Sequence, residues 1–208
     1  MIETKLRILD AAERLFGEEG FKAVSLRRIT AAAGVNLASI HYHFGSKEEL
    51  LDELIMRKAA PVNEARMEGL RRLRAAAGPN PIALEDLLEA FLAPAFHLAD
   101  SSPGFAKLMG RLHAEGIMPA VARKHFGPVG GSFTAELRRT LPDMPEDELA
   151  WRTRFAIGAM AHALNAPPIE VVGRTASELP SEVARRVVAF LSGGFRAPVA
   201  PRQKVEVK

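Results

Sequence analysis

Two histidines flank the only tyrosine of this 208-residue chain, in the stretch IHYHF at residues 40–44. A tyrosine hydroxyl and a histidine N–H can each donate a hydrogen bond to a phosphate oxygen, as many DNA-binding side chains do. Just upstream, the segment Asn36-Leu37-Ala38-Ser39 offers small and amide side chains that can reach base edges. The stretch therefore predicts contact with a nucleic acid.

The charge pattern around this stretch supports the same interpretation. Between Glu19 and Glu48 there is no acidic residue, whereas the basic residues in that window are Lys22, Arg27, Arg28 and Lys47. The whole chain has a net charge of only +3 and a pI of about 9.4, so the positive excess is local. An acid-free basic window indicates a face that meets an anion, although charge alone also allows an ordinary solvated surface.

Turn and cap residues divide the first 46 residues into three short helices. An apolar stripe predicts the first helix and Gly20 is a suitable stop. Ser25 is the expected N-cap of a second helix, whose inward residues are Leu26, Ile29 and Ala33. Gly34 then turns the chain, and a third helix from about Asn36 to Phe44 faces Ile40 and Phe44 inward.

Two short helices joined by a glycine turn and packed on a preceding helix form a helix-turn-helix, which places its second helix in the major groove of DNA. The segments ILDAAERLFGEEGF and SLRRITAAAGVNLASIHYHFGSKEEL, within residues 4–54, resemble the DNA-binding domain of the TetR family of transcriptional regulators. The resemblance implies base reading by Arg27 and phosphate binding by Lys47. It places the recognition-helix contacts at Asn36, Leu37, Ala38, Ser39, His41, Tyr42 and His43.

Ser25 and Arg28 complete the predicted DNA-binding set. Many members of the family carry a polar residue at the position of Leu37 and a tyrosine at that of His41, so the resemblance does not give the base preference. Other interpretations stay open: Tyr42 as a core aromatic, and Arg27 and Arg28 as ordinary surface charges. A metal site at His41 and His43 is disfavoured, because residues i and i+2 lie on different faces of a helix.

Apolar residues recur at helical spacing through the rest of the chain, which predicts an all-α fold. A capping box at Ser46–Glu49 opens a long helix, which Pro61 should kink or break. Glycine and proline then separate helices at 84–98, 103–114, 119–139 (interrupted by GPVGG), 146–164 and 181–192, with a linker at 166–180. We expect a DNA-binding domain at 1–46, a helical ligand-binding and dimerisation domain at 47–195, and a flexible tail at 196–208.

Phenylalanine and methionine residues concentrate around the helices at 84–98, 103–114 and 119–139, where Pro94 and GPVGG disturb regular packing. We predict an apolar effector pocket lined by Phe91, Phe96, His97, Phe105, Met109, Arg111, His113 and Phe133. Arg111 or His113 would receive an acidic head group. The later helices also loosely resemble a fatty-acid-responsive subfamily, which implies a fatty acid or acyl-CoA as the effector. A fully packed core is the alternative.

Small residues on the helix at 146–164 predict a homodimer, because they permit close helix approach. The expected contacts are Leu149, Ala156, Ala159, Met160 and Ala163, together with Val183, Val187 and either Phe190 or Leu191 of the last helix.

The sequence also disfavours several classes of protein. There is no cysteine, so disulfides, thiolate metal sites and cysteine nucleophiles are excluded. No signal peptide and no apolar run of roughly 20 residues is present, which predicts a cytoplasmic protein without a membrane partner. Neither a catalytic motif nor a phosphate loop occurs, so we expect no enzyme and no cofactor. The predicted function is a repressor released from a palindromic double-stranded DNA operator by an apolar effector. A ligand-binding enzyme and an effector-independent DNA-binding protein are the alternatives.

Overall fold

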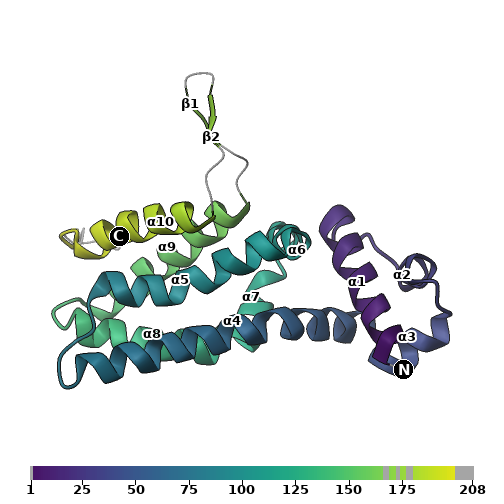
Figure 1. Ribbon diagram of the computed structural model, residues 1–208, viewed down its shortest axis with the longest axis horizontal. Helices are drawn as coiled ribbons and strands as arrows, with labels where there is room; N and C mark the ends of the chain where they lie inside the picture. The colour runs from purple at the N-terminus through teal and green to yellow at the C-terminus, as the bar shows by residue number, and fades with distance from the viewer. Residues whose placement is uncertain (1, 166–168, 172–173, 177–179, 200–208) are drawn as a thin grey trace, which may run out of the picture.

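The computed structural model describes residues 2–165, 169–171, 174–176 and 180–199, and the molecule is elongated (Figure 1). Three helices form a head at one end: α1 (Ile2–Glu19), α2 (Leu26–Ala33) and α3 (Leu37–Phe44). The long helix α4 (Lys47–Ala77) leaves the head and runs along the body. The expected all-α fold, with a helix-turn-helix head and a helical body, is confirmed.

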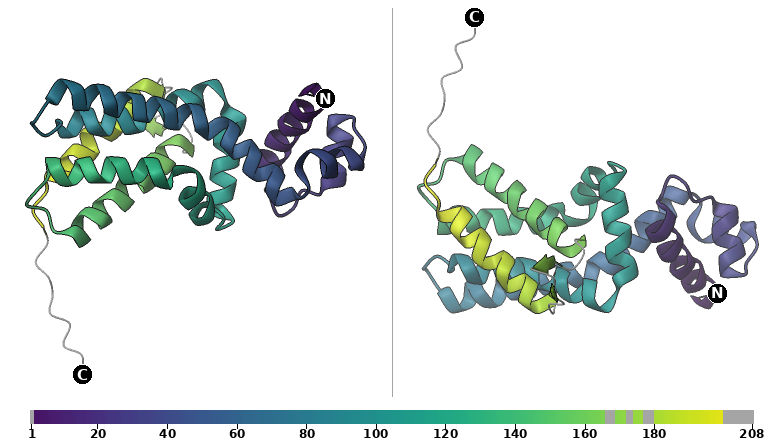
Figure 2. Two further views of the ribbon diagram at one scale, coloured as in Figure 1. Left: turned by 90° about the horizontal axis from the view of Figure 1, so that it is seen from below. Right: turned by 90° about the horizontal axis from the view of Figure 1, so that it is seen from above.

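The remaining helices form the body together with most of α4. In chain order these are α5 (Leu84–Ser101), α6 (Pro103–Ala114), α7 (Met118–Val121), the π-helical turn η1 (Ala122–Phe126), α8 (Gly127–Thr140), α9 (Glu146–Asn165) and α10 (Pro180–Arg196). Helices α5 and α10 lie side by side along the body (Figure 2). In the part of the chain that the structure describes, no helix is both long and apolar enough to cross a bilayer.

Buried apolar side chains form two separate cores. The head core joins α1, α2, α3 and the beginning of α4 to α6 and α7, through Phe105, Leu108, Leu112 and Val121. The body core joins the second half of α4 to α5, α8, α9 and α10. The sequence-based boundary at 46/47 lies between two helices, but the head core continues across it into helices of the body.

Helices α1 and α6 cross at a pair of glycines. A Cβ atom on Gly17 would lie only 3.1 Å from the carbonyl oxygen of Gly104, so a side chain there would push the helices apart. Lys58 of α4 meets the same junction, pairing with Glu13 (3.1 Å) and donating to the Ser102 hydroxyl (2.7 Å). The head is thus fastened to the body near the C-terminal end of α1.

Prolines lie inside two of the helices. Helix α4 continues through Pro61, so it has no break there, and α5 likewise continues through Pro94. An interior proline costs about 3 kcal/mol in a helix, but both helices bury long apolar faces in the cores, and that burial offsets the cost. The segment GPVGG does not interrupt a helix but begins one, because Pro128 lies in the first turn of α8, where a missing N–H does no harm. The irregular backbone lies just upstream, in η1.

The last helix extends further than the sequence predicted. It continues past residue 192 to Arg196, and Phe195 is buried in the body core. The buried Arg152 of α9 explains the extension, because its Nη1 donates to the carbonyl oxygens of Gly194 (2.8 Å), Phe195 (2.9 Å) and Ala197 (2.8 Å). The predicted helix end at 192 is therefore four residues too early; of the expected flexible tail at 196–208, residues 200–208 lie outside the described part.

The expected linker at 166–180 contains a short antiparallel pair in its described part. Strand β1 (Ile169–Val171) pairs with β2 (Arg174–Ala176) in the register Ile169↔Ala176. This pair projects from the body beyond the ends of α9 and α10 (Figure 1).

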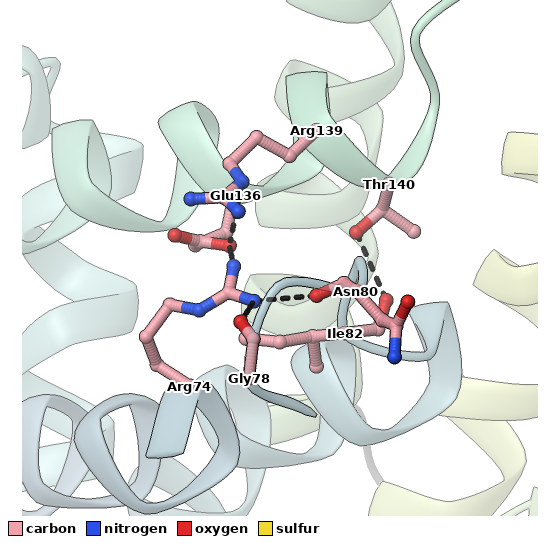
Figure 3. Close-up of polar contacts among 7 residues, drawn as sticks. All are labelled: Arg74, Gly78, Asn80, Ile82, Glu136, Arg139 and Thr140. Atoms are coloured by element: carbon pink, nitrogen blue, oxygen red, sulfur yellow. Dashed lines mark hydrogen bonds and ion pairs between the residues drawn. The ribbon is translucent and has the colours of Figure 1, made fainter. Parts of the chain in front are cut away.

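Polar contacts hold the end of α4 that lies farthest from the head (Figure 3). Arg74 pairs with Glu136 of α8 (2.7 Å) and donates to the carbonyl oxygens of Gly78 (3.0 Å) and Asn80. In the same loop, the carbonyl oxygen of Ile82 accepts from the Thr140 hydroxyl (3.0 Å). Backbone carbonyl groups at and beyond a helix end have no helical N–H partner and need other donors. Here the side chains of Arg74 and Thr140 are those donors, and they fix the loop between α4 and α5.

Candidate nucleic-acid interface

Side-chain caps and one glycine shape the turn between α2 and α3. Ser25 and Asn36 accept from the backbone N–H groups of Arg28 (3.3 Å) and Ser39 (2.9 Å), so both expected N-caps are confirmed. Gly34 has a φ of 63°, in the left-handed region that favours glycine. Arg7 of α1 donates to the Gly34 carbonyl oxygen (3.2 Å), which ties the turn to the first helix.

Helix α3 has one buried side and one exposed side. Ile40 and Phe44 are buried in the head core, as predicted. Tyr42 is 73% exposed, so the alternative that it is a core aromatic is wrong. Its ring meets the ring of His43 edge-on, with centroids 5.1 Å apart. One side of α3 is therefore packed into the head core, and the other side exposes Tyr42 to solvent.

The two histidines of α3 have different environments. His41 is exposed, and its Nδ1 lies 3.0 Å from the carbonyl oxygen of Gly45, a contact in which Nδ1 is the donor. His43 is half-buried beside the Phe44 ring, with centroids 6.1 Å apart. Across the described ranges, no group of three or more histidine, aspartate and glutamate side chains could hold a metal ion.

The N-terminal end of α3 carries the residues expected to read bases. Both the N–H (2.9 Å) and the hydroxyl (3.0 Å) of Ser39 donate to Asn36 Oδ1, so that oxygen serves the helix cap. Ala38 is exposed, and Leu37 is half-buried. The small and short side chains at this end leave the backbone accessible to a close neighbour.

The four basic residues of the acid-free window are not equivalent. Arg27 is exposed, whereas Arg28 forms an ion pair with Glu19 (2.8 Å). Lys47 lies with its Nζ 4.5 Å from the centroid of the Phe21 ring and donates to the Lys22 carbonyl oxygen (3.4 Å). The amino group of Lys22 donates to the Glu115 carbonyl oxygen (3.1 Å), which joins the head to the body. Arg27 and Lys47 are therefore the stronger candidates for contact with DNA.

The eight residues predicted to line an effector pocket divide between the two cores. Phe105 and Met109 pack in the head core, whereas Phe91, Phe96 and Phe133 belong to the body core. The polar members His97, Arg111 and His113 are exposed, and Arg111 donates to the Glu18 carbonyl oxygen (3.0 Å). A pocket of about 340 Å³ between α5 and α10 includes Phe96 and His97 in its lining. The structure does not bring the eight residues to one cavity.

Sequence reasoning missed a buried cation in the body. Arg66 of α4 is 2% exposed, and its Nε donates to the Phe91 carbonyl oxygen (2.7 Å). Its guanidinium carbon lies 4.2 Å from the centroid of the Phe91 ring, and burial lowers its pKa to about 10. A signal was available, because Val62, Arg66 and Leu70 follow one another at the four-residue spacing of a buried helix face.

The π-helical turn η1 also connects to α4 through polar groups. His125 Nε2 lies 2.8 Å from Asp52 Oδ1, and Lys124 Nζ lies 2.9 Å from the same oxygen. Burial raises the pKa of the Asp52 carboxyl, but the hydrogen bonds from Lys124 and His125 outweigh it, so the net pKa is lowered. The carbonyl oxygen of His125 accepts from Asn63 Nδ2 (2.7 Å).

The apolar surface of α9 and α10 differs from the predicted dimer face. Leu149 and Leu191 are buried inside the protomer, so neither is available to a partner. The other expected contacts are half-buried against the body core: Ala156, Ala159, Met160, Ala163, Val183 and Val187. Among the described residues of α9 and α10, the large apolar side chains that face outward are Trp151, Phe155, Ile157 and Phe190, so of the two residues expected from the last helix Phe190 is the exposed one. Contact of the half-buried residues with a second copy stays a prediction.

Known proteins resemble this chain in both parts. Residues 8–54 match the family described as bacterial regulatory proteins, tetR family, and residues 89–194 match the tetracyclin repressor-like C-terminal domain. The transcriptional regulator AcrR of Shigella flexneri is 38% identical over 66 residues, 32% of this chain and 31% of that protein. The repressor KstR2 of Rhodococcus jostii is 41% identical over 51 residues, 24% of this chain and 25% of that protein. These alignments span a third or less of either relative.

The fold is shared more widely than the sequence. The fatty acid degradation regulator FadR of Bacillus halodurans superposes with a TM-score of 0.64 at 16% identity, covering 94% of this chain and 97% of that structure. At this identity the likeness concerns the fold alone, over nearly the whole length of both chains.

Proposed function

Because the chain belongs to the TetR family of bacterial regulatory proteins, we propose that it is a DNA-binding transcriptional regulator that acts as a repressor until an effector releases it. The observation that carries the proposal is the two-sided helix α3. Ile40 and Phe44 fix it in the head core, while Tyr42 on its other side is 73% exposed. This is the arrangement that a helix needs to enter a major groove.

The contacts with DNA divide into two kinds. Arg27 and the N-terminal residues of α3, from Asn36 to Ser39, lie where base edges would be read. Tyr42, His43 and Lys47 follow one turn later, where the DNA backbone passes, and we assign them to phosphate oxygens. Ser25, Arg28 and His41 flank these groups; the ion pair of Arg28 with Glu19 gives it the weaker role of the three.

A palindromic operator requires two heads, so the proposed regulator is a homodimer. Trp151 and Phe155 of α9 and Phe190 of α10 are exposed apolar side chains that a second copy would cover. The rings of Trp151 and Phe155 lie against each other at a tilt of 31°, with centroids 5.7 Å apart. Two copies would join α9 and α10 into a four-helix interface and space the heads about 34–36 Å apart, or a multiple of that distance.

Release from DNA requires an effector that binds one arrangement of the dimer better than the other. The body is the proposed place for it, because its aromatic and thioether side chains suit an apolar molecule. The fold shared with a fatty acid degradation regulator supports a fatty acid or acyl-CoA as one candidate. The alternatives remain a ligand-binding enzyme and an effector-independent DNA-binding protein; turnover of a ligand would favour the first.

Selection from a random double-stranded DNA library tests the proposal without knowledge of the operator. The purified chain should enrich an inverted repeat whose half-sites lie about one helical turn apart. The variant Tyr42→Ala provides the control, since it leaves the buried side of α3 intact. Enrichment of no motif by the unaltered chain, or of the same motif with equal affinity by Tyr42→Ala, would count against the proposed interface.

A further inference from the structure

Among the residues of the body whose side chains the structure describes, two arginines are buried, Arg66 and Arg152, and one of these two has a carboxylate partner. Arg152 pairs with Glu148 (2.7 Å) and donates to several backbone carbonyl oxygens. For Arg66, the contacts within the described ranges are the Phe91 carbonyl oxygen (2.7 Å) and the Met160 sulfur (3.8 Å), and no ion pair occurs there. Buried charges in proteins are normally paired, because an unpaired charge is costly to remove from water.

A second unmet polar group lies one helical turn before Arg66. Asn63 donates from Nδ2 to the His125 carbonyl oxygen (2.7 Å), and this contact orients its amide. Its Oδ1 is buried and has no hydrogen-bond partner in the described part of the chain. An unsatisfied buried acceptor costs about 1–3 kcal/mol. Within one turn of α4 there are thus a cation that lacks an anion and an acceptor that lacks a donor.

The walls around these two groups are aromatic and apolar. The guanidinium carbon of Arg66 lies 4.2 Å from the centroid of the Phe91 ring and 6.0 Å from that of Phe126. Phe91 in turn packs edge-on against Phe133, with centroids 5.1 Å apart. These apolar groups would suit the hydrocarbon or aromatic part of a ligand better than a second charge.

We propose that Arg66 and Asn63 receive the head group of the effector, and that the effector is an apolar monoanion. Its acid group pairs with the Arg66 guanidinium, a hydroxyl or N–H beside the acid group donates to Asn63 Oδ1, and its apolar body lies against Phe91, Phe126 and Met160. This inference rests on the proposed function, because it names the chemical class of the regulator's effector. It replaces Arg111 and His113, which are exposed, as the receiving groups.

A purely structural role for Arg66 is the competing explanation. Pro94 of α5 has no N–H, so the carbonyl oxygen of Ala90 lacks its helical donor. Arg66 donates to the next carbonyl oxygen, that of Phe91, and would hold this turn of α5 in place. Such a structural contact requires a donor but no anion, so the two explanations differ in what a charged probe should do.

A matched pair of fluorescent probes separates them. 8-Anilinonaphthalene-1-sulfonate is an aromatic monoanion, and N-phenyl-1-naphthylamine is the same skeleton without the charge. We expect the full chain to bind the anion saturably, and Arg66→Met to weaken that binding at least tenfold while changing the affinity of the neutral probe by less than twofold. Arg71→Met, an exposed arginine of the same helix, should bind both probes as the unaltered chain does.

The variant Asn63→Asp gives an independent readout. It puts a negative charge at the position of the unmet acceptor and removes the hydrogen bond to the His125 carbonyl oxygen, so it should weaken binding of the anionic probe while the neutral probe still binds. A parallel loss of both probes in Arg66→Met, unchanged affinity for the anion in that variant, no saturable binding of the anion by the unaltered chain, or undiminished binding of the anion by Asn63→Asp would each overturn the inference. Binding of all variants to duplex DNA, measured in parallel, reports on the proposed function separately, because neither substitution touches the head.

Discussion

The head and the body satisfy their polar groups to different degrees. In the head, Ser25 and Asn36 cap their helices, and Ser46 with Glu49 forms a complete capping box at the start of α4. In the described part of the chain, the buried side-chain atoms without hydrogen-bond partners belong to Asn63, Thr153 and Ser192, all in the body. The difference teaches that the head is built to a fixed geometry, whereas the body keeps unmet groups where a ligand could meet them.

Backbone regularity differs in the same way. In the head, α2 and α3 have eight residues each and begin and end at recognisable capping residues. The body contains a π-helical turn at Ala122–Phe126 and a proline within each of two helices. Such turns concentrate at functional sites of proteins, because the wider turn costs stability. The following experiments test whether head and body differ as this comparison says.

The largest expected effect is the loss of the dimer, which leaves one head to bind DNA instead of two. Phe155→Arg places a charge on the exposed apolar surface of α9 and should convert the dimer to a monomer in sedimentation experiments. Affinity for a palindromic operator should then fall by about 100-fold or more, because one head binds instead of two linked heads. Ile157→Arg, on a different side of α9, should stay dimeric. A dimer that survives Phe155→Arg would place the interface elsewhere.

The boundary between the two cores can be tested at α6. Leu108 is fully buried in the head core, although α6 belongs to the body by sequence. Leu108→Ala should cost about 2–5 kcal/mol of unfolding free energy, measured with urea, and speed hydrogen exchange in α1–α3. Leu137→Ala, in the body core, should cost a similar amount but leave exchange in the head unchanged. Equal exchange in the head for both variants would mean that the two cores unfold as one unit.

Base reading and phosphate binding should respond differently to substitution within the head. Arg27→Ala should cost roughly 1–3 kcal/mol of binding free energy at one base position and leave the salt slope intact. Lys47→Ala should weaken binding to all sequences alike and reduce the salt slope by about one unit. Fluorescence anisotropy at several salt concentrations, on operator and mutated duplexes, measures both. A changed sequence preference in Lys47→Ala contradicts its assignment to phosphate.

Alanine substitution of one glycine in the head and one in the body tests how strongly each backbone position requires glycine. Gly34→Ala should lower the unfolding free energy by about 1–2 kcal/mol, because its φ is +63° and the new Cβ would lie 2.7 Å from Arg7 Nη2. Gly131→Ala, within α8 and with open space around it, should instead stabilise the protein by about 0.5–1 kcal/mol. Urea unfolding of both variants gives the signs; the same sign for the two would show that the turn at Gly34 is not under this constraint.

The smallest expected effect concerns an exposed ion pair of the body. Hydrogen bonds from Arg196 lower the pKa of Glu85 to about 2, from an ordinary value of 4.5. Because the folded pKa is the lower one, the pair contributes fully above pH 4.5 and its contribution is lost as the pH falls towards 2. Melting temperatures of Glu85→Gln and the unaltered chain should therefore differ slightly at pH 5 and converge at pH 2. A difference that persists at pH 2 would have another origin.

Local rules predicted the head and much less of the body. Ser25, Gly34 and the Ser46–Glu49 box act within a few residues, so the sequence states them directly. Phe96 and Phe105 look alike in sequence, yet one lies in the body core and the other in the head core, because periodicity gives a helix its apolar face but not its neighbour.

Which of two adjacent apolar residues is buried is equally hard to predict from the sequence. Phe190 and Leu191 both fit the apolar spacing of the last helix, and only the packing of α10 on α5 decides that Leu191 is buried and Phe190 exposed. Arg66 was missed for the opposite reason. A charged residue at a buried spacing looks in sequence like an ordinary polar residue of α4, since the sequence does not show whether a partner lies opposite.

The glycine crossing of α1 and α6 has a mechanical consequence. Because the backbones of Gly17 and Gly104 lie in close contact, we expect any motion of α1 relative to α6 to turn about that point. From Gly17 to Ile2 the helix is roughly 22 Å long, at 1.5 Å per residue. A swing of roughly 5° would then carry its free end through about 2 Å, and the two heads of a symmetric dimer would part by about 4 Å. The half-sites lie about 34 Å apart on DNA, so a change of about 4 Å in the separation of the heads would keep the two recognition helices from entering both major grooves together.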